Sequence, residues 1–403
     1  MKIAIAQINY LCGNFEYNKY KIIDAITHAK EEGADLVVFA EEAITGVPAH
    51  SLLVRGYFLG KAEETLVEIA AYTDDIAILV GLPIHRHGGT ASAAAFIQNR
   101  RIRRYITKRS LQSDVDAAYL KQGRGHEYIH LGGEKIAVTL GGDFLCDHDF
   151  SDASTIIVMG ADRYQQARIE RRYEYLAEKA FMADANVIFV NHIGGSSEIV
   201  YDGSSAVFNA KGKCVSLLGS FVEEIAFVDT KNMDATIEVP YQDKIANVYG
   251  ALKLGIADYF EKSHPTEKAC IVLTGGIDSS VAAVILADAL GSDRVVGMLM
   301  PSTNSNPQSI TDAAELAKTL GIELVTVPLS DIYGLALPSI VNAIGEPDAP
   351  KLEELRRSAV AEKFGTGGFY DMTLGGLLDA MKDDLDALQD CHGETVFDVY
   401  RIA

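Results

Sequence analysis

The sequence predicts an α/β protein of two domains: two sheets packed face to face and covered outside by helices, followed by a doubly wound parallel sheet. With 403 residues, of which 48% are hydrophobic, the chain is too long for one ordinary core and too apolar to be disordered. Residues 1–230 hold many strand-like segments and few helical ones, which suggests two packed sheets. Beyond residue 243, helical and strand-like segments alternate, which is typical of a parallel sheet.

The first predicted domain spans residues 1–232 and opens with a β-α-β pattern. Residues 3–8 form an apolar run, and residues 36–39 form a second one. Between them Ile22, Ile26 and Ala29 follow helical spacing, and Gly33 marks the end of that helix. Further strands are expected at residues 76–82, 94–98, 102–107, 135–140, 155–159, 187–191, 206–209 and 225–228, with a long helix at about 167–185.

A polar stretch that contains Pro240 separates the two predicted domains, and we place a linker at residues 233–243. The second domain, residues 244–403, begins with a helix over 245–260. The elements expected after it are a strand at 270–273, a glycine turn, a helix at 279–290, a strand at 295–300, a helix at 309–320 and a strand at 324–327.

Composition excludes several classes of function. The formal net charge of −20 argues against a nucleic-acid partner, because binding to phosphate backbones draws on clustered Lys and Arg. The apolar runs are far shorter than the roughly 20 residues that cross a bilayer, and no signal peptide is visible. The cysteines are odd in number and lack metal-ligand spacing, so we expect a reducing, cytoplasmic location; they are Cys12, Cys146, Cys214, Cys270 and Cys391.

The strongest motif is a glycine turn between a buried strand and a helix. Backbone N–H groups and the positive end of a helix converge at such a turn, which makes it an anion site. Glycines allow close approach of a pyrophosphate, the hydroxyls can bind phosphate oxygens, and the carboxylate can hold Mg2+. An ordinary serine-capped glycine turn is the alternative. The motif consists of Leu273, Thr274, Gly275, Gly276, Ile277, Asp278, Ser279 and Ser280.

This octet resembles the Ser-Gly-Gly-Ile-Asp-Ser pyrophosphate loop of the ATP-pyrophosphatase family, with Thr274 in place of the first Ser. Residues 252–259 before the loop, and Met300-Pro301-Ser302 with residues 309–322 after it, are similar to NAD synthetase. The resemblance implies adenylation of the nicotinate carboxyl of deamido-NAD by ATP, release of pyrophosphate, and displacement of AMP by ammonia. It also implies ATP and Mg2+ as cofactors, ATP contacts from the loop and Met300, and Asp278 as a metal ligand.

The first half resembles the nitrilase-type glutaminase domain of the long NAD synthetases. The similar segments are Ala6-Gln7, residues 34–41 with Thr45-Gly46, residues 190–195, and residues 202–205. That resemblance implies a carbon–nitrogen hydrolase fold, an α-β-β-α sandwich, and a catalytic Glu, Lys and Cys. Glu41 matches the base and Lys108 matches the lysine. A solvated loop carboxylate and a lysine that simply ends a strand are the alternatives for these two residues.

The nucleophile position departs from the family pattern. Gly141 stands where the family has its Cys, and Gly142 stands where it has Glu. Cys146 lies five positions further on, up to about 16 Å away in an extended chain, so it is a poor substitute. Three more positions depart, with Asp114, Asp162 and Arg168 in place of Tyr, Ser and Lys. The domain is therefore expected to keep its fold and to have lost glutamine hydrolysis.

The C-terminal end is shortened relative to the family. Residues 351–357, 363–368, 370–372, 375–376 and 382–383 look like remnants of family motifs, and the Glu expected to share Mg2+ with Asp278 is missing. Residues 372–388 follow the pattern of an amphipathic acidic helix, which is favoured over a binding role.

The function that follows is an ATP-dependent ligase that makes NAD, with deamido-NAD, ATP and either glutamine or ammonia as partners. The alternative is a pseudoenzyme that binds ATP, or that regulates or assembles with an active homologue. A free-standing amidase is disfavoured, because Gly141 removes its nucleophile and the phosphate loop would have no role. By resemblance, a homo-oligomer is expected.

Overall fold

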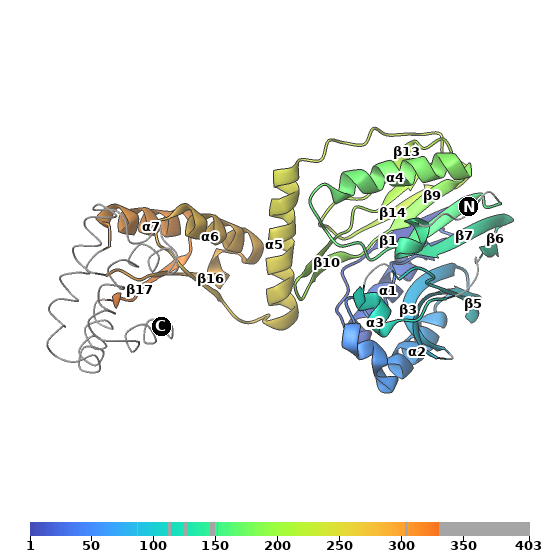
Figure 1. The fold of residues 1–403 in the computed structure, drawn as a ribbon, viewed down its shortest axis with the longest axis horizontal. Helices are drawn as coiled ribbons and strands as arrows, with labels where there is room; N and C mark the ends of the chain where they lie inside the picture. The colour runs from blue at the N-terminus through green and yellow to red at the C-terminus, as the bar shows by residue number, and fades with distance from the viewer. Residues whose placement is uncertain are drawn as a thin grey trace, which may run out of the picture. The chain divides into compact units, whose positions relative to one another are not determined.

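The structure, a computed structural model, describes residues 1–86, 88–111, 114–123, 128–145, 150, 152–302 and 305–329. The side chains of residues 114–116 and 145 are also outside the described part. The chain forms two compact units, Met1–Pro265 and Thr266–Ala403. Figure 1 shows two sheets with helices in the first unit and a smaller parallel sheet in the second.

The first sheet of the first unit joins the N-terminal β-α-β segment to a strand from far along the chain. Strands β1, β2 and β3 are parallel, whereas β14, β4 and β5 run antiparallel to their neighbours. The order is β14 (Glu224–Asp229), β1 (Lys2–Gln7), β2 (Leu36–Val38), β3 (Ala77–Arg86), β4 (Gly89–Gln98) and β5 (Arg101–Thr107).

The second sheet has the same number of strands and is also mixed. Strands β7, β8 and β9 are parallel, and β6, β12 and β13 are antiparallel additions at the two sides. The order is β13 (Cys214–Leu217), β12 (Ala206–Phe208), β9 (Asn186–Val190), β8 (Thr155–Met159), β7 (Glu134–Leu140) and β6 (Tyr128–Leu131). A separate hairpin pairs β10 (Ile193–Ser196) with β11 (Ile199–Asp202).

Alternation of side chains along each strand creates a four-layer sandwich. Ile3 and Ile5 of β1 face a central core shared with Val138 and Ile157 of the second sheet. Ala4 of β1 faces the opposite way, into a core with helices α1 (Phe15–Glu31) and α2 (Gly56–Ala70). Helix α4 (Arg168–Ala183) covers the other side of the second sheet through a third core (Figure 1). The predicted α-β-β-α arrangement is therefore confirmed.

The predicted strands and the long helix are confirmed in both units, with ends that differ by a few residues. Helix α2, the edge strands β6 and β13 and the β10–β11 hairpin were not predicted. Gly56 and Gly60 weaken the helical signal of α2, and Gly194 and Gly195 weaken the strand signal of β10. The short helices also escaped prediction: α3 (Asp114–Tyr119) and the 3-10 turns His50–Val54, Gly141–Leu145 and Ser292–Arg294.

The second unit contains a parallel sheet, as predicted. Strands β15 (Ala269–Val272), β16 (Val295–Leu299) and β17 (Glu323–Thr326) lie in that order. Helices α6 (Ile277–Leu290) and α7 (Pro307–Leu320) connect them, pack on β16 and contact each other. The N-terminus of α7 is capped by Asn306, whose side-chain oxygen accepts the N–H of Gln308 at 3.0 Å, and Pro307 occupies the first turn.

Helix α5 (Lys244–Ser263) packs against the β10–β11 hairpin and belongs to the first compact unit. Asp258, 8% exposed, accepts hydrogen bonds from the Asn9 amide at 2.9 Å and from the Gly195 N–H at 2.6 Å. One turn later, the Lys262 ammonium contacts Asp258 at 3.0 Å and donates to the Asn9 side-chain oxygen at 2.7 Å. Burial lowers the pKa of Lys262, although Asp258 acts in the opposite direction.

Gly195 allows the β10–β11 hairpin to pack closely on α5, because a Cβ atom there would lie 3.0 Å from the Gly255 Cα atom of α5.

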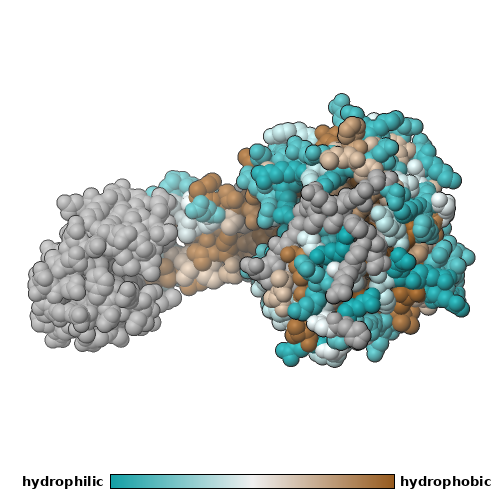
Figure 2. Space-filling model, turned by 45° about the vertical axis from the view of Figure 1, so that its right-hand side comes forward, coloured by the Kyte–Doolittle hydropathy of each residue, from teal (hydrophilic) through white to brown (hydrophobic). Residues whose placement is uncertain are grey.

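On the face drawn in Figure 2, hydrophilic side chains cover most of the first unit and apolar ones are scattered. In the part of the chain that the structure describes, every helix is too short or too polar to span a membrane.

Replacing Asp258 with Ala is expected to destabilise the first unit by about 3 kcal/mol, because it leaves the Lys262 charge buried without its partner. Chemical denaturation followed by far-UV circular dichroism measures this change in the free energy of unfolding. Lys253→Ala, on the exposed side of the same helix, is the control and should change stability by less than about 0.5 kcal/mol. Equal effects of the two variants would contradict the importance of the Asp258 network.

Candidate functional site

Glu41 lies just after β2 and is 3% exposed. One of its carboxylate oxygens, Oε1, accepts a hydrogen bond from the Ser92 hydroxyl of β4 at 2.9 Å. The same oxygen contacts the ammonium of Lys108, which directly follows β5, at 2.9 Å. The other oxygen, Oε2, is buried and has no hydrogen-bond partner among the described residues. The Glu41 carboxylate thus has one oxygen that is paired and one that is buried without a described partner.

Gly141 directly follows β7 and faces this pair. Its φ of +46° lies in the left-handed region, which favours glycine. A Cβ atom at this position would lie 2.7 Å from Glu41 Oε2 and 3.4 Å from Lys108 Nζ. The structure therefore brings together the three positions at which sequence analysis placed a base, a lysine and a missing nucleophile.

Backbone and buried side chains hold these segments in place. The Glu41 N–H donates to the Gly160 carbonyl at 3.2 Å, and the His192 Nε2 atom contacts the Glu41 carbonyl. Asp143 accepts the backbone N–H of Arg109 at 2.9 Å, which ties the turn after β7 to the segment after β5. Burial raises the pKa of Asp143, and the backbone N–H groups of Arg109 and Ser110, which donate to it, lower that pKa.

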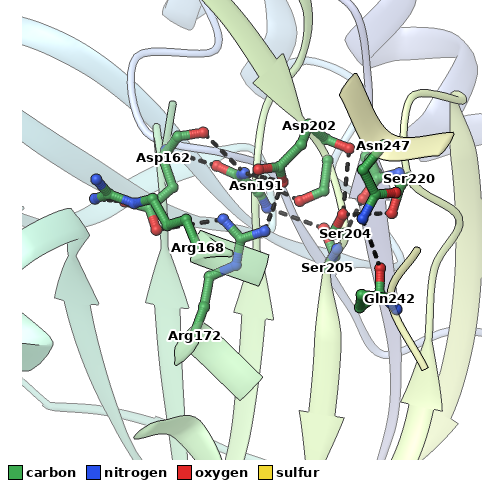
Figure 3. Close-up of polar contacts among 12 residues, drawn as sticks. Asp162, Arg168, Arg172, Asn191, Asp202, Ser204, Ser205, Ser220, Gln242 and Asn247 are labelled. Atoms are coloured by element: carbon green, nitrogen blue, oxygen red, sulfur yellow. Dashed lines mark hydrogen bonds and ion pairs between the residues drawn. The ribbon is translucent and has the colours of Figure 1, made fainter. Parts of the chain in front are cut away.

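Arginine and aspartate side chains form a chain of ion pairs on one side of the site (Figure 3). Asp162 contacts Arg168 at 3.2 Å and Arg172 at 3.3 Å, and Arg172 also pairs with the fully buried Asp202. Asn191 supports the chain by accepting the Asp162 N–H at 2.8 Å. The two departures at positions 162 and 168 therefore form one ion pair in this protein.

A cavity of about 310 Å³ opens in front of these groups. Its wall includes Glu41, Lys108, Gly141, Asp162 and Arg168, so the expected base, lysine and nucleophile positions share one space. The cavity is within the usual range of small-molecule sites. It combines charges of both signs with the unpaired Glu41 oxygen.

The site lacks a thiol at the position that faces Glu41 and Lys108. Cys146 lies outside the described residues. Cys12 donates its S–H to the Pro48 carbonyl at 3.3 Å, and burial first, then Glu42, raises its thiol pKa to about 11. Burial likewise raises the thiol pKa of Cys214 to about 11. Neither thiol is prone to form the thiolate that acts as a nucleophile. The position that faces Glu41 and Lys108 therefore carries no side chain, and both described thiols named here lie in other surroundings.

Ser92 was not predicted as a site residue, although it is a polar residue in the alanine-rich strand β4 and is 1% exposed. A buried polar side chain needs a partner, and Glu41 supplies it. The signal that could have found Ser92 is this single hydroxyl among residues 91–96, which are otherwise alanine and phenylalanine.

In the second unit, the predicted phosphate loop lies between β15 and α6. The Thr274 and Ser279 hydroxyls are 3.1 Å apart, and the Gly276 N–H donates to the Thr274 hydroxyl at 3.3 Å. Ser280 donates its hydroxyl to the Gly276 carbonyl at 2.8 Å. The first turn of α6, which includes Ile277 and Asp278, presents N–H groups that have no intrahelical partner. The loop thus has the geometry of an anion site.

Gly275 fixes the path of this loop. Its φ is +78°, and a Cβ atom there would lie 2.4 Å from the carbonyl oxygen of Ser309 in α7. Leu273 is buried beneath the loop, whereas Ile277 and Asp278 are exposed. Met300 follows β16 at the same carboxyl edge of the sheet, next to β15. The structure therefore places all the predicted ATP-binding residues at one edge.

Among the described residues no three His, Cys, Asp or Glu side chains gather as a metal cluster. Within residues 273–280, all of which the structure describes, Asp278 is the one carboxylate. The expected remnants of family motifs at residues 351–383, and the amphipathic helix at residues 372–388, lie outside the described residues.

Comparison with known proteins agrees with both halves of the sequence. The family model for carbon–nitrogen hydrolases matches residues 2–237, and the one for NAD synthase matches residues 248–349. The glutamine-dependent NAD(+) synthetase of Thermotoga maritima is 30% identical over 100% of this chain and 80% of its own length. The chain belongs to the glutamine-dependent NAD synthetase family.

Solved structures of this family and of an amidase share the fold. The glutamine-dependent NAD+ synthetase of Acinetobacter baumannii, solved with ADP, superposes with a TM-score of 0.82 at 26% identity, covering 90% of this chain and 73% of that one. An amidase of the nitrilase superfamily from Nesterenkonia has a TM-score of 0.53 at 21% identity over 58% of this chain, which shows a common fold. The NAD synthase match begins inside α5, a helix that packs on the first unit.

Buried His192 is expected to make the stability of the first unit fall at acidic pH. Burial lowers its pKa to about 4, so the unfolded chain, with a pKa near the ordinary 6.5, binds the proton more readily. The stability from neutral His192 is complete above about pH 6.5 and is lost as the pH falls toward 4, by about 3 kcal/mol in all. His192→Asn is expected to flatten this part of the stability–pH curve, measured by denaturation at successive pH values.

The exposed His85 provides the control, since His85→Asn should leave the slope unchanged. An unaltered slope in His192→Asn would show that other groups cause the acid sensitivity.

Gly275→Ala is expected to disrupt the phosphate loop, because the new Cβ atom meets the Ser309 backbone at 2.4 Å. The second unit should lose about 2 kcal/mol or more, and binding of a fluorescent ATP analogue should fall at least about tenfold. Gly291→Ala is the matched control, because Gly291 also has a positive φ, +86°, but its Cβ atom would meet the movable Asp293 side chain. Similar ATP binding in both variants would exclude a role for the close approach at Gly275.

Proposed function

We propose that this chain is an ATP-dependent carbon–nitrogen ligase that makes NAD from deamido-NAD and takes its nitrogen from ammonia supplied by the solution or by another protein. The observation that carries the ammonia part is Gly141, which faces the Glu41–Lys108 pair with no side chain to attack an amide. The ligase part is supported by membership of the family and by the phosphate loop at residues 273–280.

The loop suits the phosphates of a nucleoside triphosphate. The Acinetobacter baumannii relative was solved with ADP, and the hydroxyls and N–H groups around Gly275 and Gly276 have the geometry that phosphates need. Thr274 and Ser279 would bind phosphate oxygens, and the first turn of α6 would stabilise the charge on the departing pyrophosphate. Leu273, Ile277, Ser280 and Met300 would complete the nucleotide contacts from the same edge of the sheet.

The exposed Asp278 carboxylate fits Mg2+, which proteins hold through one or two carboxylates together with substrate phosphates. The ion would supply positive charge that offsets the charge developing on the leaving pyrophosphate. Ammonia then attacks the adenylated nicotinate carboxyl, the C–N bond forms, and AMP leaves with the bond electrons. In the family this ammonia comes from glutamine, and we propose that here it comes from solution or from another protein.

The proposed division of labour follows residues 1–232, a linker at 233–243, and residues 244–403. The amidase-like part would keep its fold and its cavity without glutamine hydrolysis. Glutamine hydrolysis through a thioester needs a nucleophile, and removing one typically lowers turnover by several orders of magnitude.

One assay tests this function: the full chain with ATP, Mg2+ and deamido-NAD, supplied with either ammonium or glutamine. We expect NAD and pyrophosphate with ammonium, and a rate at least about 100-fold lower with glutamine, because position 141, which faces Glu41, is a glycine and not a cysteine. NAD formation and pyrophosphate release are both measured by chromatography.

NAD formed equally well from glutamine would show that another group replaces the missing nucleophile. Absence of pyrophosphate under both conditions, with measurable ATP binding, would favour the second candidate, an ATP-binding pseudoenzyme. The specific observation behind that candidate is that, in the described residues, Asp278 is the only carboxylate of the loop.

A further inference from the structure

A second cavity, of about 270 Å³, lies between helix α4 and the outer face of the second sheet, and we call it the α4 cavity. It adjoins the first cavity at Gly141 and Asp162, whereas Glu41 and Lys108 are wall residues of the first cavity. An apolar cavity of about 150 Å³ is enough to hold benzene. The α4 cavity therefore has room for an aromatic ring with a small substituent.

Aromatic side chains line the α4 cavity. The rings of Phe144 and Tyr175 meet edge to face, with centroids 5.7 Å apart, and the Tyr175 hydroxyl donates to the Phe144 carbonyl at 3.1 Å. Phe189 forms another part of the wall, and the Arg172 guanidinium lies 5.1 Å from its ring centroid. Contacts between aromatic rings are worth more than their buried area alone. An aromatic ligand therefore suits this wall better than an aliphatic one of the same size.

Arginine side chains give the wall of the α4 cavity an excess of positive charge. Arg168 and Arg172 contact Asp162 at 3.2 and 3.3 Å, and Arg172 also pairs with Asp202, as Figure 3 shows. These two carboxylates balance the two guanidinium groups. Arg171 also lines the cavity, is exposed, and has no ion pair or side-chain hydrogen bond in the described part of the chain. The Arg171 charge is therefore available to an anion.

A buried donor in the same wall lacks a partner. Arg172 Nε has no hydrogen-bond partner among the described residues, and its side chain is 6% exposed. Buried polar groups are normally hydrogen-bonded, and an unpaired one costs free energy. An acceptor oxygen in the cavity would remove that cost, whereas a second donor would not. A carboxylate offers two acceptor oxygens together with the negative charge that complements Arg171.

We propose that the α4 cavity binds a small aromatic carboxylate. The ring of the ligand packs against Phe144, Tyr175 and Phe189, and its carboxylate accepts hydrogen bonds from Arg171 and from Arg172 Nε. Hydrogen bonds between arginine and a carboxylate are among the strong ones, because both groups are charged. The first unit thus acts as a ligand-binding module, a role that goes beyond NAD formation and does not depend on it.

Isothermal titration of the full chain tests the site with benzoate as the probe. We expect benzoate to bind with a dissociation constant below about 1 mM. Benzamide has the same ring and a similar shape without the charge, so it should bind at least about tenfold more weakly. Cyclohexanecarboxylate keeps the charge but has no aromatic ring, so it should bind at least about threefold more weakly.

Arg171→Gln is expected to weaken benzoate binding at least about tenfold, because it removes the charge that has no partner in the wall. Arg171 is exposed, so the variant should fold normally. Arg101→Gln, at an exposed position of β5, is the matched control and should bind benzoate as the parent chain does.

Tyr175→Ala removes one ring of the wall and should weaken benzoate binding at least about fivefold. Tyr175→Phe keeps the ring and should bind benzoate normally even if the alanine variant folds poorly. Tyr57→Ala, at a 75% exposed position of α2, is the control.

Glutamine at about 10 mM should leave benzoate binding unchanged, because the α4 cavity is separate from the Glu41–Lys108 pair. Competition by glutamine would place benzoate in the first cavity and overturn the proposal.

The proposal is also overturned if benzoate does not bind at about 10 mM, if benzamide binds as tightly as benzoate, or if Arg171→Gln binds benzoate as well as the parent chain. None of these results depends on NAD synthesis, so they are separable from failure of the proposed ligase activity.

Discussion

The face-to-face packing of two sheets is the constraint on which the amidase-like site depends. Residues of β1, β2 and β3 on one sheet share a core with residues of β7, β8 and β9 on the other. That packing brings segments that follow these strands to Glu41, whose N–H donates to Gly160 after β8 and whose carbonyl contacts His192 after β9. The carboxyl ends of parallel strands are where α/β folds place their ligands. A change in the core between the sheets would therefore displace the site as well as destabilise the fold.

The carbon–nitrogen hydrolase fold is complete around position 141, where the residue is a glycine. The Glu41–Lys108 contact, the Ser92 hydrogen bond and the Asp143 tie between two turns are all present without a thiol at Gly141. These interactions stabilise the turns themselves, since they satisfy buried charges and backbone donors. A glycine at position 141 is therefore compatible with an intact fold, in which Glu41 Oε2 is buried without a hydrogen-bond partner among the described residues.

Backbone conformation and short side-chain contacts shape the phosphate loop of the second unit. Gly275 lets the loop pass close to the backbone of Ser309, and the hydroxyls of Thr274 and Ser279 hold the turn by hydrogen bonds.

Helix α5 shows that the boundary of the family match and the boundary of the compact unit fall at different residues of the chain. The NAD synthase match begins within this helix, but Asp258 and Lys262 fix it to Asn9 and Gly195 of the first unit.

Local pattern alone determined most of the strands, the helices other than α2 and the short ones, and the phosphate loop, because periodicity and turn chemistry depend on neighbouring residues. It also indicated Glu41 and Lys108, through their resemblance to a family motif. Tertiary structure decided the rest. Ser92, Asp143 and His192 contact the Glu41 and Lys108 segments from strands far apart in sequence, and the Arg–Asp chain joins Asp162 to Asp202 through Arg172. Such partners are chosen by the packing of two sheets, a long-range effect that no local window of the sequence contains.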